Sequence, residues 1–307
     1  MKRRPSPAVR LTRTFLGLTL MLAPAVCTPV RAEAPAPNTV EVTADERARC
    51  LAILRAGLTS EEFWPSMHAA EALTLAGRGS EVVAALKDKL PQETNDQRRC
   101  GLVRELVRAG DPSPLPVLQA ILLDTKSNGR IHAAESFYKL GVPSEGPALA
   151  QAFAQDEIVQ LKLMSAAALA RLGSRNALES LRTQFGSDDK LVRNTVCFAL
   201  ARLGTADDLP MLRQQLERET DPLARANLVN ALACLGDAQA RKDQTLGLES
   251  AEPGIRASTA EHVGHARAFE HRPRLVQLLD DPGLDVRIRA AQSLIALSLP
   301  PVEWRKR

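Results

Sequence analysis

The sequence contains a short motif, ending in glycine, that returns at a nearly constant spacing. Six tripeptides of this kind end at Gly77, Gly110, Gly141, Gly173, Gly204 and Gly236. Two further steps of the same length reach Arg267 and Ser298, where the glycine is lost but the preceding pattern continues. A fixed period of roughly 30 residues is typical of a solenoid, in which every repeat is one small structural unit.

Apolar or small residues keep their places in each repeat, at one, four, seven and eight positions before the glycine, as in Cys197 and Leu200 before Gly204. These offsets trace one face of an α-helix, which the glycine can end in a left-handed turn. A second apolar helix follows in most repeats, and no stretch alternates as a strand would. We therefore predict an all-α chain, a right-handed α-α superhelix of about eight helical hairpins stacked into one elongated spiral.

The strings LVRNTVCFALARLG (191–204) and DVRIRAAQSLIAL (285–297) show the repeat most clearly. They resemble HEAT-like repeats, especially the short subtype named after phycobilisome lyases, and the resemblance covers roughly residues 60–298. It implies an α-solenoid, and for function it implies mostly protein-binding scaffolds with a few enzymes. Two places depart from the pattern. Residues 237–250 contain few apolar side chains, and the seventh repeat lacks its glycine, so we expect the stack to bend or loosen there.

Residues 1–32 predict a secretory signal peptide. A basic start is followed by an apolar run, Phe15–Ala23, and by small residues at Val30 and Ala32 that predict cleavage before Glu33. The run is too short to remain as a membrane span. We expect an exported protein, periplasmic or secreted, with no membrane span after cleavage. Lipidation of Cys27 stays open, although the preceding Val26 fits a lipid-attachment signal poorly.

Cleavage changes the charge of the chain. The segment 1–32 carries six of the 40 lysines and arginines and none of the 36 acidic side chains, so 34 basic side chains remain and the mature chain has a net charge of −2. Because nucleic-acid binding depends on positive charge, we expect no nucleic-acid partner. Residues 33–45 are rich in proline and alanine and predict a flexible linker. Residues 46–307 then form the solenoid, with an N-terminal capping helix and a C-terminal cap.

The string His-Ala-Ala-Glu occurs at residues 68–71 and again at 132–135, at equivalent positions of two repeats. Two packed repeats separate the pairs by on the order of 20 Å, so one metal ion cannot bridge them, and we expect no metal site. The same helix stripe carries basic side chains in the first three repeats. We take this stripe as the candidate partner-binding face, with a plain solvated surface as the alternative: His68, Glu71, Arg104, Arg108, His132, Glu135 and Lys139.

A second column lies eleven positions before the glycine and is basic in seven of eight repeats: Arg99, Arg130, Lys162, Arg193, Arg225, Arg256 and Arg287. It falls in the first turn of each helix, where the helix dipole disfavours cations. Carboxylates or loop carbonyls must offset this, and arginine can bind both. We interpret the column as a structural basic ladder that fixes each loop, and an anion-binding track is the alternative.

Little else in the sequence indicates chemistry. His262, His265 and His271 leave a zinc site open, but no metalloprotease motif accompanies them. No glycine-rich phosphate loop and no serine nucleophile motif occurs. The spacing of Cys50, Cys100, Cys197 and Cys234 matches no zinc motif, and we expect these residues to be buried as small apolar side chains.

These observations predict a non-catalytic exported scaffold that binds a protein partner through one face of the solenoid and uses no cofactor. One alternative is a lyase-type or other enzyme subunit that uses the groove. Another is a carbohydrate- or metal-binding accessory protein, for which Trp64, Tyr138 and Trp304 are the obvious aromatic candidates.

Overall fold

The computed structural model describes residues 39–301, and within them every regular element is helical, with sixteen α-helices and three short 3₁₀ helices. The all-α class and the repeated hairpins are thereby confirmed. The expected signal peptide, Cys27 and Trp304 lie outside the described residues. The expected linker overlaps the first helix, which begins at Ala44 behind a capping box formed by Thr43 and Glu46.

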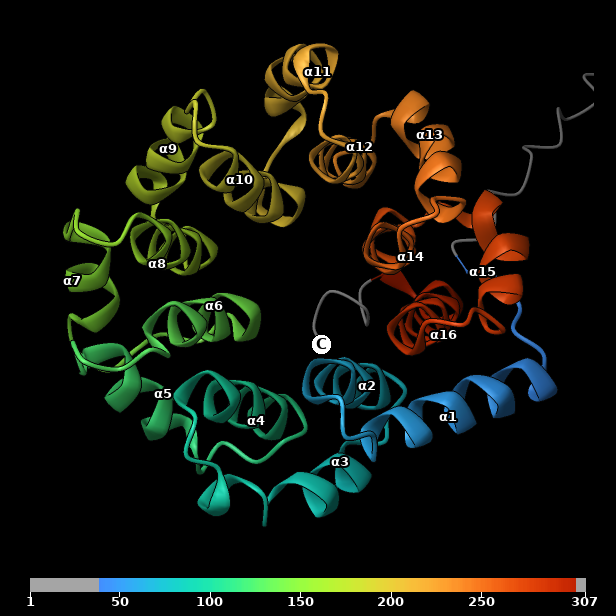
Figure 1. The fold of residues 1–307 in the computed structure, drawn as a ribbon, viewed down its shortest axis with the longest axis horizontal. Helices are drawn as coiled ribbons and strands as arrows, with labels where there is room; N and C mark the ends of the chain where they lie inside the picture. Colours follow the sequence, from blue (N-terminus) through green and yellow to red (C-terminus); the bar gives the residue numbers. More distant parts are fainter. Residues whose placement is uncertain (1–38, 302–307) are drawn as a thin grey trace, which may run out of the picture. The chain divides into compact units, whose positions relative to one another are not determined.

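The helices alternate between an inner and an outer layer (Figure 1). The inner helices are α2 (Phe63–Leu75), α4 (Asp96–Arg108), α6 (Arg130–Leu140), α8 (Val159–Arg171), α10 (Lys190–Leu203), α12 (Pro222–Cys234), α14 (Pro253–Ala266) and α16 (Leu284–Ser298). The outer helices are α1 (Ala44–Leu58), α3 (Gly79–Leu86), α5 (Leu115–Leu123), α7 (Ala148–Ala154), α9 (Arg175–Gln184), α11 (Leu209–Arg218), α13 (Ala238–Leu248) and α15 (Arg272–Leu278). The 3₁₀ helices are η1 (Leu90–Gln92), η2 (Ala206–Asp208) and η3 (Phe269–His271).

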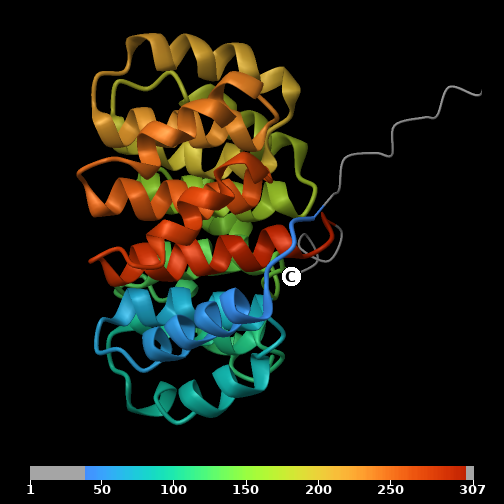
Figure 2. The same ribbon diagram turned by 90° about the vertical axis from the view of Figure 1, so that its right-hand side faces the viewer.

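The stack closes into a ring, which differs from the elongated spiral expected from the sequence. Helix α16 packs against both α1 and α2, so the last repeat meets the first. The inner helices are seen roughly end-on around the axis of the ring in Figure 1 and lengthwise in Figure 2. Each hairpin turns a little relative to its neighbour, and here the accumulated rotation completes a circle.

The expected capping helix, α1, does not cover a free end of the stack. Every outer helix from α1 to α15 packs against the inner helix that follows it in the chain, as α1 does against α2 and α15 against α16. Helix α1 also packs on α16, so it bridges the first and last inner helices. Near this contact the backbone N–H of Val40 donates to the carbonyl of Leu297 at 3.0 Å.

The buried apolar residues form two clusters rather than one. One cluster follows α4 to α13, and the other joins α1–α4 to α14–α16 across the point of closure. The clusters part near α13, where the sequence is poor in apolar residues. There the buried side chain of Gln244 donates to Asn230 at 3.1 Å, so a polar contact takes the place of an apolar one.

The turns after the inner helices behave largely as the glycine motif predicts. Five of the six motif glycines have a positive φ, as Gly173 does at 99°. Gly204 is the exception, with an extended backbone that leads into a capping box between Thr205 and Asp208. In the seventh repeat Arg267 takes the left-handed conformation itself, at φ 52°, so the turn persists without glycine.

Candidate interaction face and polar interior

The inner helices all run in the same direction, because an inclined outer helix leads the chain back between each inner helix and the next. Their first turns therefore lie together at one side of the ring, which we name the amino face, and their glycine turns lie at the opposite side, the carboxyl face. Residues of the predicted stripe occupy equivalent positions on the inner helices and therefore point toward the axis of the ring. The stripe thus lines the inside of the ring.

The candidate stripe of the first three repeats is largely paired. Glu71 lies 3.4 Å from Arg108 and 3.3 Å from Arg289, which comes from the far end of the chain. Arg104 and Arg108 both bind Glu105, which is fully buried. A side chain absent from the sequence-based set, Arg289, therefore connects the predicted stripe to the last inner helix.

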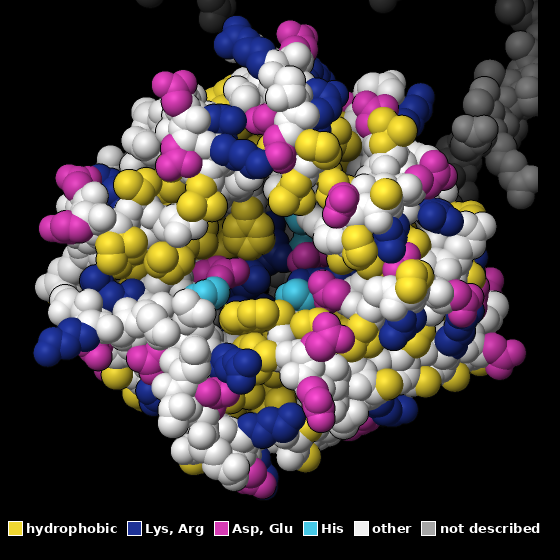
Figure 3. Space-filling view, in the orientation of Figure 1, with side chains coloured by type: hydrophobic (Ala, Val, Ile, Leu, Met, Phe, Trp, Pro, Cys, Tyr) yellow, Lys and Arg dark blue, Asp and Glu magenta, His cyan; other side chains and the backbone are white. Residues whose placement is uncertain are grey.

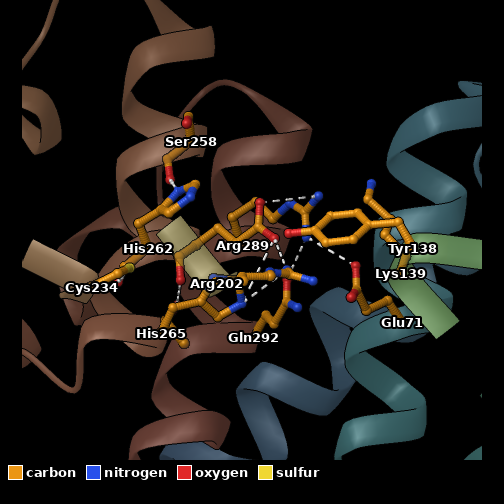
Figure 4. A network of polar contacts seen from close by, with 12 residues as sticks. Glu71, Tyr138, Lys139, Arg202, Cys234, Ser258, His262, His265, Arg289 and Gln292 are labelled. Carbon is orange, nitrogen blue, oxygen red and sulfur yellow. Dashed lines mark hydrogen bonds and ion pairs between the residues drawn. The ribbon is translucent and has the colours of Figure 1, made fainter. Parts of the chain in front are cut away.

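The same network continues around the ring (Figure 4). Arg289 lies 3.5 Å from Glu261, and Arg202 lies 3.4 Å from the same carboxylate and 3.3 Å from His265. We refer to these side chains as the interior charge network: Glu71, Arg104, Glu105, Arg108, Arg202, Glu261 and Arg289. It joins α2, α4, α10, α14 and α16, although several of these helices are far apart in the sequence.

Charge neutralisation keeps this network ionised. Burial would raise the pKa of Glu71, but Arg108 and Arg289 hold that pKa well below its ordinary value. Burial would also raise the pKa of Glu261, but the attraction of Arg289 outweighs it and lowers that pKa. Burial lowers the pKa of His265, and the nearby Arg202 adds to the effect, so this histidine is neutral near pH 7. Charges that compensate each other in this way suit a structural role in the interior of the ring.

The two His-Ala-Ala-Glu strings have different surroundings. His68 Nδ1 lies 2.7 Å from Asp285 of α16, whereas His132 Nδ1 lies 3.4 Å from Glu135. Glu135 also binds Lys139 at 2.9 Å. Across the described part of the chain, no group of three or more His, Cys, Asp or Glu side chains is arranged to hold a metal ion.

His132 also forms part of an aromatic contact that spans two repeats. The ring of Trp64 stacks on it, with centroids 5.3 Å apart and planes at 21°. In the intervening repeat, Gly101 of α4 leaves room for the rings at the start of α2, since a Cβ at that position would lie 3.0 Å from the ring of Phe63. The tight curvature of the ring thus brings the starts of α2 and α6 together.

The three histidines of the seventh repeat do not converge. His262 and His265 are in edge contact at 5.4 Å, and His262 Nδ1 lies 2.7 Å from the carbonyl of Ser258. His271 instead lies 2.5 Å from the carbonyl of Arg241. A backbone carbonyl engages one ring nitrogen of His262 and one of His271, and Arg202 lies 3.3 Å from Nε2 of His265.

The basic ladder lies at the loops before the inner helices. Arg225 donates to the carbonyls of Leu216 and Glu219 at 2.8 and 2.7 Å. Arg256 binds Asp281 through two nitrogens, at 2.8 and 3.0 Å, in addition to two loop carbonyls. The other members bind in the same manner: Arg99 to Asp96, Arg130 to the Leu122 carbonyl, Lys162 to Asp156, Arg193 to the carbonyls of Ser187 and Asp188, and Arg287 to those of Asp281 and Pro282.

The four described cysteines are free thiols in apolar surroundings. Burial raises the pKa of Cys50 to about 11 and that of Cys197 to about 12. Cys100 and Cys234 behave in the same way, with pKa values of about 12. These thiols are protonated at neutral pH, whereas a nucleophile or metal ligand requires a thiolate.

The amino face carries a pocket of about 450 Å³ between α4, α6, α8 and α10, which we name the α4–α10 pocket. His132 and Glu135 of the predicted stripe line it together with Met164 and Phe198. Side-chain amides supply much of its polar lining: Gln97, Asn128, Gln160 and Asn194. A second pocket, of about 390 Å³, lies beside the start of α2.

Exposed apolar side chains are distributed unevenly between the two faces. Leu191 and Leu223, in the first turns of α10 and α12, are 52% and 43% exposed. With these residues we define an apolar rim on the amino face: Trp64, Ile158, Val159, Leu191 and Leu223. Leu123 and Leu246 are exposed at the ends of outer helices on the same side. On the carboxyl face only Leu172 belongs to this class of exposed large side chains among the described residues.

The rim was missed by the sequence reasoning, although a signal for it exists. Trp64, Leu191 and Leu223 each lie thirteen positions before the motif glycine, outside the apolar stripe that forms the core. Figure 3 shows hydrophobic side chains around the central hollow of the ring, with charged and histidine side chains deeper on its wall.

Comparison with known proteins supports the repeat class. A sequence profile described as HEAT repeats matches residues 147–233, and the same hairpin geometry continues on both sides of that segment. Residues 147–233 are therefore HEAT-like repeats. None of the curated proteins matches it in sequence.

Solved structures give weak overall similarity. Human deoxyhypusine hydroxylase in complex with glycerol is 18% identical, with 85% of this chain and 97% of that one covered and a TM-score of 0.39. The complex of CpcE and CpcF of phycocyanin lyase from Nostoc sp. PCC7120 is 18% identical, with coverage of 86% and 98% and a TM-score of 0.41. At these values we draw no functional argument from either.

Within residues 39–301, no helix combines the length and the apolar character that crossing a bilayer requires.

Proposed function

We propose that the protein is an exported, non-catalytic scaffold that binds a protein partner through the amino face of its ring. The observation that carries the proposal is the concentration of exposed large apolar side chains on that face. Contiguous exposed apolar surface with a polar surround is typical of protein interaction sites. HEAT-like repeats, in which rigid helices present a broad surface, commonly serve this purpose.

The original candidate face takes a changed role in this proposal. Its side chains are largely paired on the interior wall, and only His132 and Glu135 reach the α4–α10 pocket on the amino face. We therefore propose the apolar rim, in place of that stripe, as the main contact surface for the partner. The interior charge network keeps the rim residues in fixed relative positions.

The non-catalytic assignment is supported by the state of the reactive groups. The described cysteines have raised thiol pKa values, and the buried carboxylates of the interior are neutralised by arginines. As for the carbohydrate alternative, Tyr138 is fully buried and Trp304 lies outside the described residues, which leaves Trp64 as the exposed aromatic candidate. An aliphatic rim fits a protein surface better than it fits a sugar.

Export remains part of the proposal and rests on the basic start, the apolar run and the small residues before Glu33. N-terminal sequencing of the protein from the native cell checks it directly. A chain that begins near Glu33 in the exported fraction is expected. A chain that retains Met1 in the cytosol would contradict it.

The binding face is tested with charged substitutions on the two sides of the ring. Leu191→Lys combined with Leu223→Lys places two charges in the rim, and Leu172→Lys is a matched control because that leucine is 42% exposed on the carboxyl face. Capture from the exported fraction, followed by mass spectrometry, measures partner recovery. We expect the control to recover the same partner as the wild type and the rim variant to lose it at least tenfold. Equal recovery by both variants would reject the amino face.

A further inference from the structure

The α4–α10 pocket contains side-chain amides that find no partner within the described part of the protein. Gln160 and Asn194 are half-buried, and their side chains make no hydrogen bond to any described residue. The same is true of the exposed side chain of Asn128. Gln97 uses one donor only, to the carbonyl of Asn128 at 3.3 Å. Four amides, from α4, the loop before α6, α8 and α10, thus face one space with most of their hydrogen-bonding capacity unused.

A primary amide presents a donor and an acceptor side by side, as a peptide group does. In an extended chain, the N–H and C=O of every second residue point to the same side, so a row of amides can pair with its backbone. Half-buried polar groups gain more from such pairing than fully solvated ones, because part of their desolvation has already occurred on folding. The amides therefore match a backbone better than they match a charged group.

The charges near the pocket also limit its ligand. Inside, the carboxylate of Glu135 is balanced by Lys139 at 2.9 Å. Outside, the loops before α8 and α10 add the exposed acidic residues Glu157 and Asp188, which form no ion pair with any described residue. On the α8 and α10 side of the pocket these carboxylates disfavour an acidic ligand and favour a neutral or basic one.

The neighbouring rim distinguishes a peptide from a sugar. Val159 adjoins Gln160 in the first turn of α8, and Leu191 precedes Asn194 by one turn in α10. Aliphatic side chains of this kind pack against the apolar side chains of a polypeptide, whereas sugars stack on aromatic rings. Trp64 is the exposed aromatic ring nearest to the pocket, through its stack on His132.

We propose that the α4–α10 pocket binds an extended, neutral or basic peptide segment of the partner, whose backbone pairs with Gln97, Gln160 and Asn194. One apolar side chain of the segment enters the pocket against Met164 and Phe198, and flanking side chains cover Val159 and Leu191. A volume of about 450 Å³ suits a few residues of such a segment. The inference rests on the proposed function and assigns the chemistry of the partner at that face.

The probe is a displayed library of random dodecapeptides, selected on the purified protein. A selected peptide is then synthesised in two forms, one unmodified and one N-methylated along its central backbone, and both are measured by calorimetry. The test variants are Gln160→Met and Asn194→Leu, which remove an amide at nearly constant size. Gln151→Met, on the exposed side of outer helix α7, is the control.

We expect enrichment of peptides with apolar and basic residues, and a three- to tenfold loss of affinity for each amide removed. N-methylation is expected to abolish binding, and the control is expected to change nothing. Failure to enrich any peptide, or affinity unchanged in both amide variants, overturns the inference. So does binding of neutral oligosaccharides that the same two variants abolish. If the amide variants have no effect while Leu191→Lys with Leu223→Lys still loses the partner, this inference fails and the proposed function stands.

Discussion

The closure of the ring, where α16 meets α1 and α2, differs instructively from the middle of the ring around α8, α10 and α12. In the middle, neighbours in space are also neighbours in sequence, and apolar side chains such as Val196 and Leu200 fill their contacts. At the closure, the partners come from opposite ends of the chain. Ile288 is as fully buried there as Leu200 is in the middle, and it reaches toward Gly57 of α1.

The closure also carries polar contacts between helices from opposite ends of the sequence. Glu71 pairs with Arg289, and His68 Nδ1 lies 2.7 Å from Asp285, so an ion pair and a hydrogen bond cross between the first and last inner helices. Apolar packing alone would allow α16 to slide along α2, whereas paired charges match in one register only. We infer that the ends of the solenoid cap each other, and that the charges fix how they align.

The largest expected effect comes from removing the cation at the closure. Arg289→Met leaves Glu71 and Glu261 buried with less compensation, and we expect a loss of about 3–5 kcal/mol in the free energy of unfolding. Urea denaturation followed by circular dichroism measures it. A second change, Glu71→Gln, is expected to recover part of the loss. In the middle of the ring, Lys190→Met removes the exposed pair with Asp221 and is expected to cost less than about 1 kcal/mol. Equal losses at the two sites would contradict a special role for charge at the closure.

The next effect tests whether the ring is closed in solution. Ile288→Ala and Leu200→Ala each remove a fully buried side chain, so each is expected to cost about 2–4 kcal/mol in urea denaturation. In an open spiral Ile288 would lose its contact with α1, and its replacement would cost far less than that of Leu200. A loss for Ile288→Ala alone that is no larger than a surface substitution causes, about 0.5 kcal/mol, therefore indicates an open chain.

Acid is expected to weaken the closure before the middle. Burial lowers the pKa of His68 and of His262, so both are neutral when folded and bind protons more readily when unfolded. The stability they provide is complete above the ordinary histidine pKa of about 6.5 and is lost as the pH falls below it. Asp285 and Glu71 have lowered pKa values, and their contribution is lost at more acidic pH, below the ordinary carboxyl range.

We expect the free energy of unfolding to fall by on the order of 1 kcal/mol per histidine between pH 7 and pH 5. Urea denaturation at several pH values measures the slope. The variant His262→Gln should flatten this slope without affecting the steeper loss in the carboxyl range. A slope between pH 7 and pH 5 that is unchanged in this variant would exclude His262 as a source.

The smallest effect on stability concerns the rim. Leu191→Lys and Leu172→Lys both alter exposed side chains, so each is expected to change the free energy of unfolding by less than about 0.5 kcal/mol. Thermal melting of the purified variants checks this. A larger loss for Leu191→Lys would mean that its binding defect reflects damage to the fold.

The sequence predicted the hairpins well because the apolar offsets and the turn residues are local properties. Even the turn at Arg267 was located by period alone. Closure could not be predicted, since it depends on small rotations that add up over all repeats. The pair between Glu71 and Arg289 spans 218 residues, and no local pattern indicates it.

The candidate site was predicted in part. The stripe containing Glu71 and Arg108 was identified as one surface, but its pairing required the ring geometry. The expectation that the stack bends or loosens after the sixth repeat stays a prediction, and the scarcity of apolar residues behind it accompanies a buried polar contact between Gln244 and Asn230. The rim at Leu191 and Leu223 was not predicted, because it is marked by apolar residues outside the core stripe and not by polar residues at repeated positions.

The position of α1 between α2 and α16 has a consequence for synthesis. Among the described helices α1 is made first and α16 last, so α1 can pack on α2 early, whereas its contact with α16 forms only at the end. The side of α1 that faces α16 therefore stays uncovered while the intervening repeats are made, since contacts between distant segments form late. That side of α1 is where a chaperone would be expected to bind the nascent chain.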